Sequence, residues 1–263
     1  MTNKNEYSHL SVIHPDARIA PNVEIGPFVT IHENVEIGEG SKIMSGVTIF
    51  PGARIGKNVT IFPGAVISAI PQDLKFNGED TLAIIGDNTV LRECVTIHRG
   101  TASKGKTEVG ENCLIMAYSH VAHDCHVKNH VIMSNAVQLA GEVIVDDYAI
   151  VGGGALVHQF CHLGAHIMIQ GGALINKDIP PFVKAAREPI SYTGINTIGL
   201  RRRNFSNEVI TQIQDIYRCL YLSGMNVTDA VAYIQAEFPP TPERDEILNF
   251  VLNSQRGIIK GYV

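Results

Sequence analysis

The chain has 263 residues and a formal net charge of −5, with 45% hydrophobic residues and no tryptophan. The acidic balance argues against a general nucleic-acid-binding protein, and no apolar run approaches the roughly 18 residues that a membrane span needs. Its five cysteines include no CxxC pair and its N-terminus is polar, which predicts a cytoplasmic protein with free thiols and no structural zinc.

A six-residue period dominates the chain from residue 13 onward. Large aliphatic residues recur at every sixth position, and the position two before each of them is mostly small or apolar. The first uninterrupted run consists of isoleucines: Ile13, Ile19, Ile25, Ile31, Ile37, Ile43, Ile49, Ile55, Ile61 and Ile67. After two interruptions the same frame continues to residue 175. Neither the helical period of 3.6 nor the strand period of 2 fits this spacing.

This period predicts a β-solenoid whose triangular coils each contain three hexapeptides. The large aliphatic side chains would point inward, and the coils would stack at the strand spacing of about 4.8 Å. Roughly nine coils are expected before the repeat ends. Residues 18 positions apart should then lie above one another, so His123, Gly141 and Gln159 should form one outward-facing column. His120 also avoids the inward positions.

Two segments break the frame. In the first, near residues 69–80, Asp73 and Glu79 occupy inward positions, where unpaired carboxylates are costly. The second, near residues 99–106, contains glycine and serine. We expect both segments to leave the prism as loops, which often carry function on a rigid scaffold. Asp73 and Lys75 are therefore candidates for binding a polar substrate, with an ordinary solvated loop as the alternative.

The repeat ends near residue 176, and we expect residues 182–205 to be irregular. They contain the basic triplet Arg201-Arg202-Arg203. These arginines either clamp phosphates, meet an acidic partner or form a solvated turn before a helix.

A helical period begins at Ser206 and predicts three short amphipathic helices. The second should open at Thr228 and the third at Thr241, so that they form a small bundle. The predicted organisation is a β-helix over residues 1–181, and a linker with an α-helical C-terminal domain over residues 182–263.

His123 is the strongest candidate for catalysis. A histidine has an unperturbed pKa of about 6.5 and suits a general base at neutral pH. The adjacent Asp124 would take a hydrogen bond from the imidazole and fix its tautomer. The backbone N–H of Gly141, one coil above, would donate to an oxyanion. This layout suits acyl transfer to a hydroxyl, while surface histidines or a zinc site at a subunit interface remain alternatives.

Several motifs are more specific than the repeat: QDLK at 72–75, VTIHRG at 95–100, HVAHDC at 120–125, VHQFC at 157–161 and GAH at 164–166. They resemble those of the UDP-N-acetylglucosamine O-acyltransferase family, and the resemblance covers essentially the whole chain. It implies a left-handed parallel β-helix with a small α-helical C-terminal domain, assembled as a homotrimer with active sites between adjacent prisms. It also implies transfer of a 3-hydroxyacyl group from acyl carrier protein to the 3-hydroxyl of UDP-N-acetylglucosamine, the first step of lipid A synthesis.

The resemblance also assigns roles to individual residues. It makes His123 the general base, Asp124 the residue that orients it and Gly141 the oxyanion donor. The positions that match substrate contacts are Asp73, Lys75, His120, His158 and Gln159, with Asn196, Arg202 and Arg203 holding the uridine and phosphate end. Gly171 matches the end of the acyl groove. We expect no cofactor and no metal.

The chain departs from the family pattern at three positions. Glu142 follows the oxyanion glycine where well-known members have histidine, which changes the local field. Gln170 replaces a small residue beside Gly171 and would reshape the acyl groove. Ile198 replaces an acidic residue between Asn196 and the arginines.

Three rival interpretations accompany the leading one. Another β-helix acyltransferase, such as the N-acyltransferase that acts later in the same pathway, would carry a different N-terminal domain. A zinc-dependent hydratase of the carbonic anhydrase type would bind one zinc ion per subunit. A non-catalytic scaffold would not bind the UDP-sugar near Lys75 and Arg203.

Overall fold

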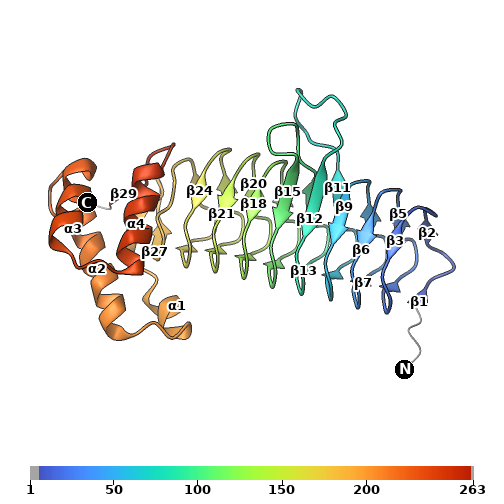
Figure 1. Ribbon diagram of the computed structural model, residues 1–263, viewed down its shortest axis with the longest axis horizontal. Helices are drawn as coiled ribbons and strands as arrows, with labels where there is room; N and C mark the ends of the chain where they lie inside the picture. Colours follow the sequence, from blue (N-terminus) through green and yellow to red (C-terminus); the bar gives the residue numbers. More distant parts are fainter. Residues whose placement is uncertain (1–5, 262–263) are drawn as a thin grey trace.

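The computed structural model describes residues 6–261, which form a rod of stacked coils with helices at its C-terminal end (Figure 1). The remaining residues of the predicted domain ranges, 1–5 and 262–263, lie outside the described part. The rod is a left-handed parallel β-helix, as expected. Its three walls are separate sheets, here named wall A, wall B and wall C.

The chain visits the walls in a fixed order. Wall A contains β1 (Glu6–Tyr7), β4 (Glu24–Ile25), β7 (Lys42–Ile43), β10 (Thr60–Ile61), β13 (Val90–Leu91), β16 (Leu114–Ile115), β19 (Ile132–Met133), β22 (Ile150–Val151), β25 (Met168–Ile169), β27 (Val183–Ala186), β28 (Ser191–Ile195) and β29 (Lys260–Gly261). Wall B contains β2 (Val12–Ile13), β5 (Thr30–Ile31), β8 (Thr48–Ile49), β11 (Val66–Ala69), β14 (Thr96–His98), β17 (His120–Val121), β20 (Gln138–Leu139), β23 (Leu156–Val157) and β26 (Leu174–Ile175). Wall C contains β3 (Arg18–Ile19), β6 (Glu36–Ile37), β9 (Ala53–Ile55), β12 (Leu82–Ile85), β15 (Lys106–Val109), β18 (His126–Val127), β21 (Ile144–Val145) and β24 (His162–Leu163). The turns from one wall to the next define the B/C, C/A and A/B edges of the prism.

The register of the walls confirms the 18-residue coil. His120 pairs with Gln138, and Gln138 pairs with Leu156. The large aliphatic residues of the frame point inward, so that Ile61 and Leu139, for example, are 0% exposed. Burial of this continuous ladder drives the stacking of the coils, because apolar burial is the dominant favourable contribution to folding.

The coil lengthens where the chain leaves the prism. Val66 pairs with Thr96, 30 positions later, and Thr96 pairs with His120, 24 positions later. The extra residues form two loops, 70–81 between β11 and β12, and 99–105 between β14 and β15. Both loops emerge at the B/C edge and project from the same side of the rod (Figure 1).

The segment 182–205 contains regular secondary structure, so the expectation of an irregular linker was wrong. Its strand β27 pairs with β25 and continues wall A, and β28 pairs with β27 in the antiparallel sense. Met168 pairs with Lys184, 16 positions later, instead of a residue 18 positions later. This shortened coil takes β27 out of the six-residue frame, which explains why the repeat did not reveal it.

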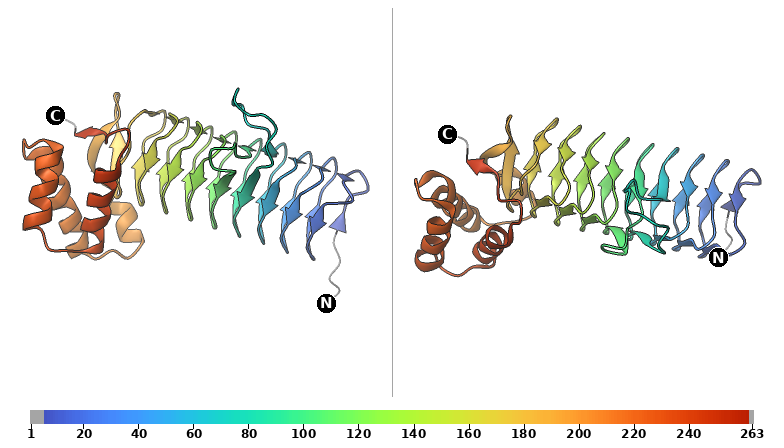
Figure 2. Two further views of the ribbon diagram at one scale, coloured as in Figure 1. Left: turned by 45° about the horizontal axis from the view of Figure 1, so that its top comes forward. Right: turned by 90° about the horizontal axis from the view of Figure 1, so that it is seen from above.

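Within residues 6–261, four helices follow β28 and gather at one end of the rod (Figure 2). They are α1 (Thr197–Arg202), α2 (Asn207–Leu222), α3 (Val227–Glu237) and α4 (Pro242–Asn253). Ser206 and Thr241 cap α2 and α4 as predicted. The predicted start of α3 at Thr228 was wrong, because Asn226 caps that helix by accepting a hydrogen bond from the N–H of Asp229. Helix α1 was not predicted.

The helical domain packs onto the last coil through α2. Its buried face consists of Ile210, Ile213, Ile216, Tyr217 and Leu220. The Tyr217 hydroxyl donates a 2.6 Å hydrogen bond to the backbone oxygen of Pro181, which ties the domain to the end of the repeat. Among the described residues, no helix has both the length and the apolar character needed to cross a membrane.

The inward and outward positions of one strand should respond differently to truncation. Ile61→Ala removes a fully buried side chain from wall A and should lower the free energy of unfolding by about 2–5 kcal/mol. Thr60→Ala, on the outer face of the same strand, should change it by less than about 0.5 kcal/mol. Urea unfolding of both variants at one protein concentration measures the difference, and equal losses would contradict the assigned register.

Candidate active site

The His123–Asp124 pair lies in the turn of the B/C edge that follows β17. The Nδ1 atom of His123 is 2.8 Å from Oδ2 of Asp124. The Asp124 side chain is 0% exposed, whereas that of His123 remains 18% exposed. The carboxylate can therefore hold the proton on Nδ1, which leaves the lone pair of Nε2 available on the open side of the ring. Within residues 6–261, nothing forms a hydrogen bond to this Nε2.

Among the described residues, Asp124 forms no ion pair with a lysine or arginine, and hydrogen bonds favour its ionised form. Burial alone would raise the pKa of its carboxyl group, but hydrogen bonds from Thr101 and His123 outweigh this effect and lower the pKa. The backbone of Asp124 adopts a left-handed conformation, with φ of 61°. Its N–H donates to Oγ1 of Thr107 over 2.8 Å, which secures the turn.

Gly141 lies directly above the imidazole, as the coil length predicts. A Cβ atom on Gly141 would be 2.5 Å from Cε1 and 2.6 Å from Nε2 of His123, so any larger residue would displace the ring. In the part of the chain that the structure describes, the Gly141 N–H has no acceptor. The glycine thus provides both room for the imidazole and an unused backbone donor beside it.

Two further histidines extend the site along wall B. His98 and His120 pack edge to face, with ring centroids 4.7 Å apart, and Nδ1 of His120 is 2.7 Å from Oγ1 of Thr96. Burial lowers the pKa of His98 to about 4, and the nearby His120 and His123 add to this shift. Burial also lowers the pKa of His120. Burial therefore favours the neutral form of both rings.

These histidines line a cavity of about 440 Å³ on the wall B side of the edge. The predicted residues His120, His123, Gly141 and Gln159 all contribute to it. His158 lies beside it on the surface, and its Nδ1 contacts the backbone oxygen of Gln159 over 3.1 Å. Four of the predicted site residues therefore line this cavity, and His158 and Asp124 lie at the same edge of the prism.

Asp73 and Lys75 lie on the 70–81 loop, at the same edge but nearer the N-terminus. Asp73 uses Oδ1 to accept the N–H of Lys75 over 2.9 Å, which shapes the loop. Lys75 is exposed. Gln72 of the same loop reaches the cavity of His123.

The predicted uridine and phosphate residues lie at a different edge. Asn196 caps α1: its Oδ1 accepts the N–H of Gly199, and its Nδ2 donates to the backbone oxygen of His166. Arg203 donates to the backbone oxygen of Tyr148 and stacks 5.0 Å above that ring. Tyr148 and His166 belong to turns of the C/A edge, so Arg203 and the exposed Arg202 do not reach the cavity of His123 in the same chain.

Gly171 marks the third edge. It follows β25 and precedes β26, which places it in an exposed turn of the A/B edge. A Cβ atom there would meet only the backbone of Gly153 in the coil below, with its nearest atom 3.1 Å away. The single chain therefore distributes the predicted site residues over all three edges.

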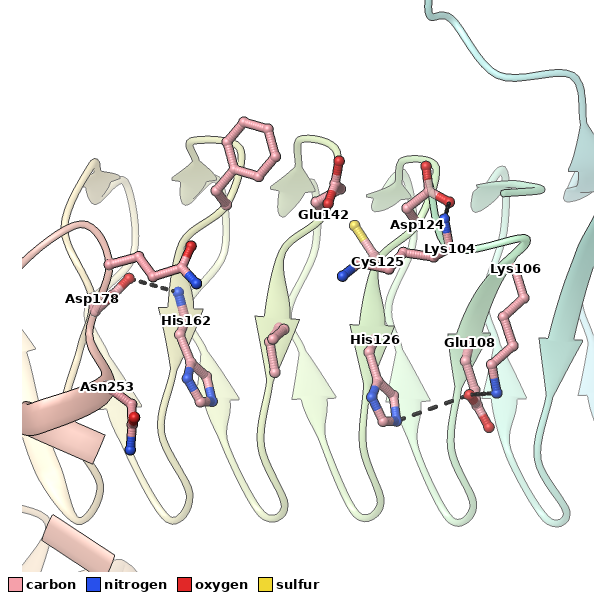
Figure 3. A pocket seen from close by; sticks show the side chains of 13 residues that line it. Lys104, Lys106, Glu108, Asp124, Cys125, His126, Glu142, His162, Asp178 and Asn253 are labelled. Carbon is pink, nitrogen blue, oxygen red and sulfur yellow. Dashed lines mark hydrogen bonds and ion pairs between the residues drawn. The ribbon is translucent and has the colours of Figure 1, made fainter. Parts of the chain in front are cut away.

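A second cavity, of about 430 Å³, lies on the wall C side of the same B/C edge. Its lining includes Lys104, His126 and His162 (Figure 3). Glu142 lines this cavity and not that of His123, and its Oε1 accepts a 3.1 Å hydrogen bond from the Ser103 hydroxyl. The acidic side chain that departs from the family pattern is therefore turned toward the 99–105 loop.

Sequence reasoning missed His98, Gln72 and Thr101. The sequence could have revealed the position of His98. Across the second loop, residues 24 positions apart lie above one another, which places His98 beneath Ala122 and next to His120. The contacts of Thr101 and Gln72 were not recoverable, because loop residues have no register.

Comparisons with known proteins agree with this architecture. Residues 178–259 match the model of the UDP-N-acetylglucosamine O-acyltransferase family, domain 2, and residues 10–43 and 34–69 match the bacterial transferase hexapeptide family. A relative from Xylella fastidiosa, named acyl-[acyl-carrier-protein]–UDP-N-acetylglucosamine O-acyltransferase, is 46% identical over 96% of this chain and 99% of its own length. One from Pseudomonas syringae is 47% identical over 95% of this chain and 97% of its own.

Solved structures give the same result. The UDP-N-acetylglucosamine acyltransferase of Bacteroides fragilis superposes with a TM-score of 0.95 and 56% identity, covering 96% of this chain and 99% of the other. That of Francisella novicida gives a TM-score of 0.94 and 40% identity, covering 97% and 94%. With this identity over nearly the full length, the chain belongs to the UDP-N-acetylglucosamine O-acyltransferase family.

Proposed function

We propose that the chain transfers a 3-hydroxyacyl group from acyl carrier protein to the 3-hydroxyl of UDP-N-acetylglucosamine, the first step of lipid A synthesis. The names of its relatives support the donor and the acceptor. The observation that carries the chemistry is the stacking of Gly141 on a histidine whose Nδ1 is held by a buried carboxylate. This arrangement would provide a base and an oxyanion donor.

In the proposed reaction, Nε2 of His123 removes the proton from the sugar hydroxyl as its oxygen attacks the thioester carbonyl. The negative charge that develops on the carbonyl oxygen is met by the Gly141 N–H. Collapse of the tetrahedral intermediate breaks the C–S bond, and the imidazolium returns its proton to the departing thiolate. Asp124 keeps Nδ1 protonated throughout and stabilises the imidazolium.

The distribution of residues over three edges supports a homotrimer. If wall A of each copy packs against wall B of the next, the three A/B edges meet at the threefold axis. The B/C edge of one copy, with His123, then lies beside the C/A edge of its neighbour, with Arg203. A closed ring of three such identical contacts satisfies all interfaces.

The outer faces of the walls support this packing. From β13 to β25, wall A presents an aliphatic ladder formed by Val90, Leu114, Ile132, Ile150 and Met168, which pair in register. Wall C presents mostly polar residues instead, including Arg18, Glu36, Arg54, Glu108, His126 and His162. An apolar face rarely stays in water, whereas a charged face suits the outside of the trimer.

In the proposed trimer, the B/C edge of one copy and the C/A edge of the next would form a composite cleft, and each predicted substrate residue would have a role there. Arg202 and Arg203 of a neighbouring copy would hold the diphosphate, because a guanidinium binds phosphate oxygens with two parallel hydrogen bonds. Asp73, Lys75, His120, His158 and Gln159 would contact the sugar and the acyl donor from the B/C edge. The acyl chain would run between walls A and B toward Gly171. Asn196 uses one lone pair of Oδ1 for the helix cap and one N–H for the oxygen of His166, which leaves one lone pair and one N–H for the uridine.

A cytoplasmic location fits the cysteines. All five are free thiols: Cys94, Cys113, Cys125, Cys161 and Cys219. Burial raises the pKa of Cys113 and Cys161 to about 11, so these thiols are unreactive packing residues. Free cysteines are typical of reducing compartments.

Removal of the base should abolish activity without disturbing the fold. His123→Ala should lower kcat by about 100- to 10,000-fold, the usual contribution of a positioned general base. His126→Ala, an exposed histidine on wall C, is the matched control and should retain activity. The assay uses UDP-N-acetylglucosamine and a 3-hydroxyacyl carrier protein, and full activity of His123→Ala would contradict the assigned base.

Co-expression of two inactive variants tests the composite cleft. His123→Ala and Arg203→Ala damage different edges, so a randomly mixed trimer should regain roughly a quarter of its sites, where an intact B/C edge meets an intact C/A edge. The activity of purified mixed trimers measures this recovery. Mixed assemblies no more active than the two separate variants would show that one chain supplies both edges of the site.

A further inference from the structure

The 99–105 loop is a compact structure held against the His123–Asp124 pair. The N–H of Gly105 donates to the oxygen of Thr101 within the loop, and the N–H of Leu82 in β12 donates to the oxygen of Gly105. The Thr81 hydroxyl adds a 2.6 Å hydrogen bond to the oxygen of Gly100. Thr101 is consequently only 7% exposed and fixed in position.

Thr101 and the loop provide most of the hydrogen bonds to the Asp124 carboxylate. Oδ1 accepts the backbone N–H of Thr101 over 2.9 Å and that of Lys104 over 3.2 Å. Oδ2 accepts the Thr101 hydroxyl over 2.6 Å, and the same oxygen is 2.8 Å from Nδ1 of His123. Figure 3 shows Lys104 beside Asp124 at the edge. A buried carboxylate without a cation depends on such donors to remain ionised.

The Thr101 hydroxyl makes a second contact, in which its oxygen is the acceptor. Oγ1 of Thr101 accepts the N–H of Ser103 over 3.1 Å, so its own proton is free to point at Asp124. Two donors, the Thr101 hydroxyl and the His123 Nδ1–H, therefore share one oxygen. Because the two donors compete for Oδ2, Asp124 holds the imidazole less strongly than an unshared oxygen would. The contacts on both carboxylate oxygens also fix the plane of the Asp124 carboxylate.

We propose that Thr101 is a positioning residue for acyl transfer, which orients Asp124 and tunes the basicity of His123 by sharing Oδ2 with the imidazole. This inference rests on the proposed role of His123 as general base. It also gives the 99–105 loop a function, because the loop supplies the contacts that the coils themselves do not make.

Thr101→Val tests the proposal, because it keeps the shape and the backbone N–H but removes the hydroxyl. Loss of a hydrogen bond to a charged group should lower kcat by about 10- to 100-fold, with little change in KM for either substrate. An unshared Oδ2 binds the imidazolium more strongly, so the acid limb of the kcat/KM profile should move to higher pH. Thr101→Ser should restore both kcat and the profile.

Ser103→Ala is the matched control, because it removes a hydroxyl of the same loop that contacts Glu142 instead of Asp124. It should leave kcat and the pH profile unchanged. If Thr101→Val folds poorly, Thr101→Ala should show the same shift of the acid limb at a temperature where it is folded.

The proposal is overturned if Thr101→Val or Thr101→Ala shows the wild-type pH profile, or if activity falls only in proportion to unfolding and serine does not rescue it. His123→Ala in the same assay separates this failure from that of the general-base assignment. An inactive His123→Ala beside a normal Thr101→Val would refute the role of Thr101 alone. An active His123→Ala would refute the base, and with it any role for Thr101 in positioning it.

Discussion

The stacking of coils in constant register is the constraint on which the site depends. Because the coils around the site contain 18 residues each, a sequence separation of 18 becomes direct vertical contact, which is how Gly141 lies on His123. Inward-pointing aliphatic residues hold this register along the whole prism. The scaffold therefore fixes the proposed base and the proposed oxyanion donor relative to each other before any substrate arrives, and such preorganisation is a major source of catalytic power.

The two inserted loops add what a regular solenoid lacks. A repeating wall offers few side chains that converge on one point, because successive coils present their residues in parallel columns. The 99–105 loop interrupts this order and brings backbone and hydroxyl donors to Asp124. The 70–81 loop brings Gln72 to the cavity of His123. Both insertions occur at the B/C edge, where the chemistry is proposed, and the other two edges carry no comparable loops among the described residues.

The sequence alone predicted the coils, the outward direction of His120 and His123 and the position of Gly141, because all of these follow from a period. It did not predict strand β27, whose pairing with β25 is two residues short of the coil length. It placed the start of α3 at Thr228, because threonine and asparagine both cap helices and only the packed structure selects Asn226. It also missed Thr101, since the path of a loop depends on tertiary contacts.

The most direct test of this account is a crystal structure of the protein with UDP-N-acetylglucosamine bound. We expect the 3-hydroxyl of the sugar to lie within hydrogen-bond distance of Nε2 of His123, near the Gly141 N–H, while Arg203 of an adjacent copy holds the diphosphate. A sugar bound at another edge, or a diphosphate held by the same chain that supplies His123, would contradict it.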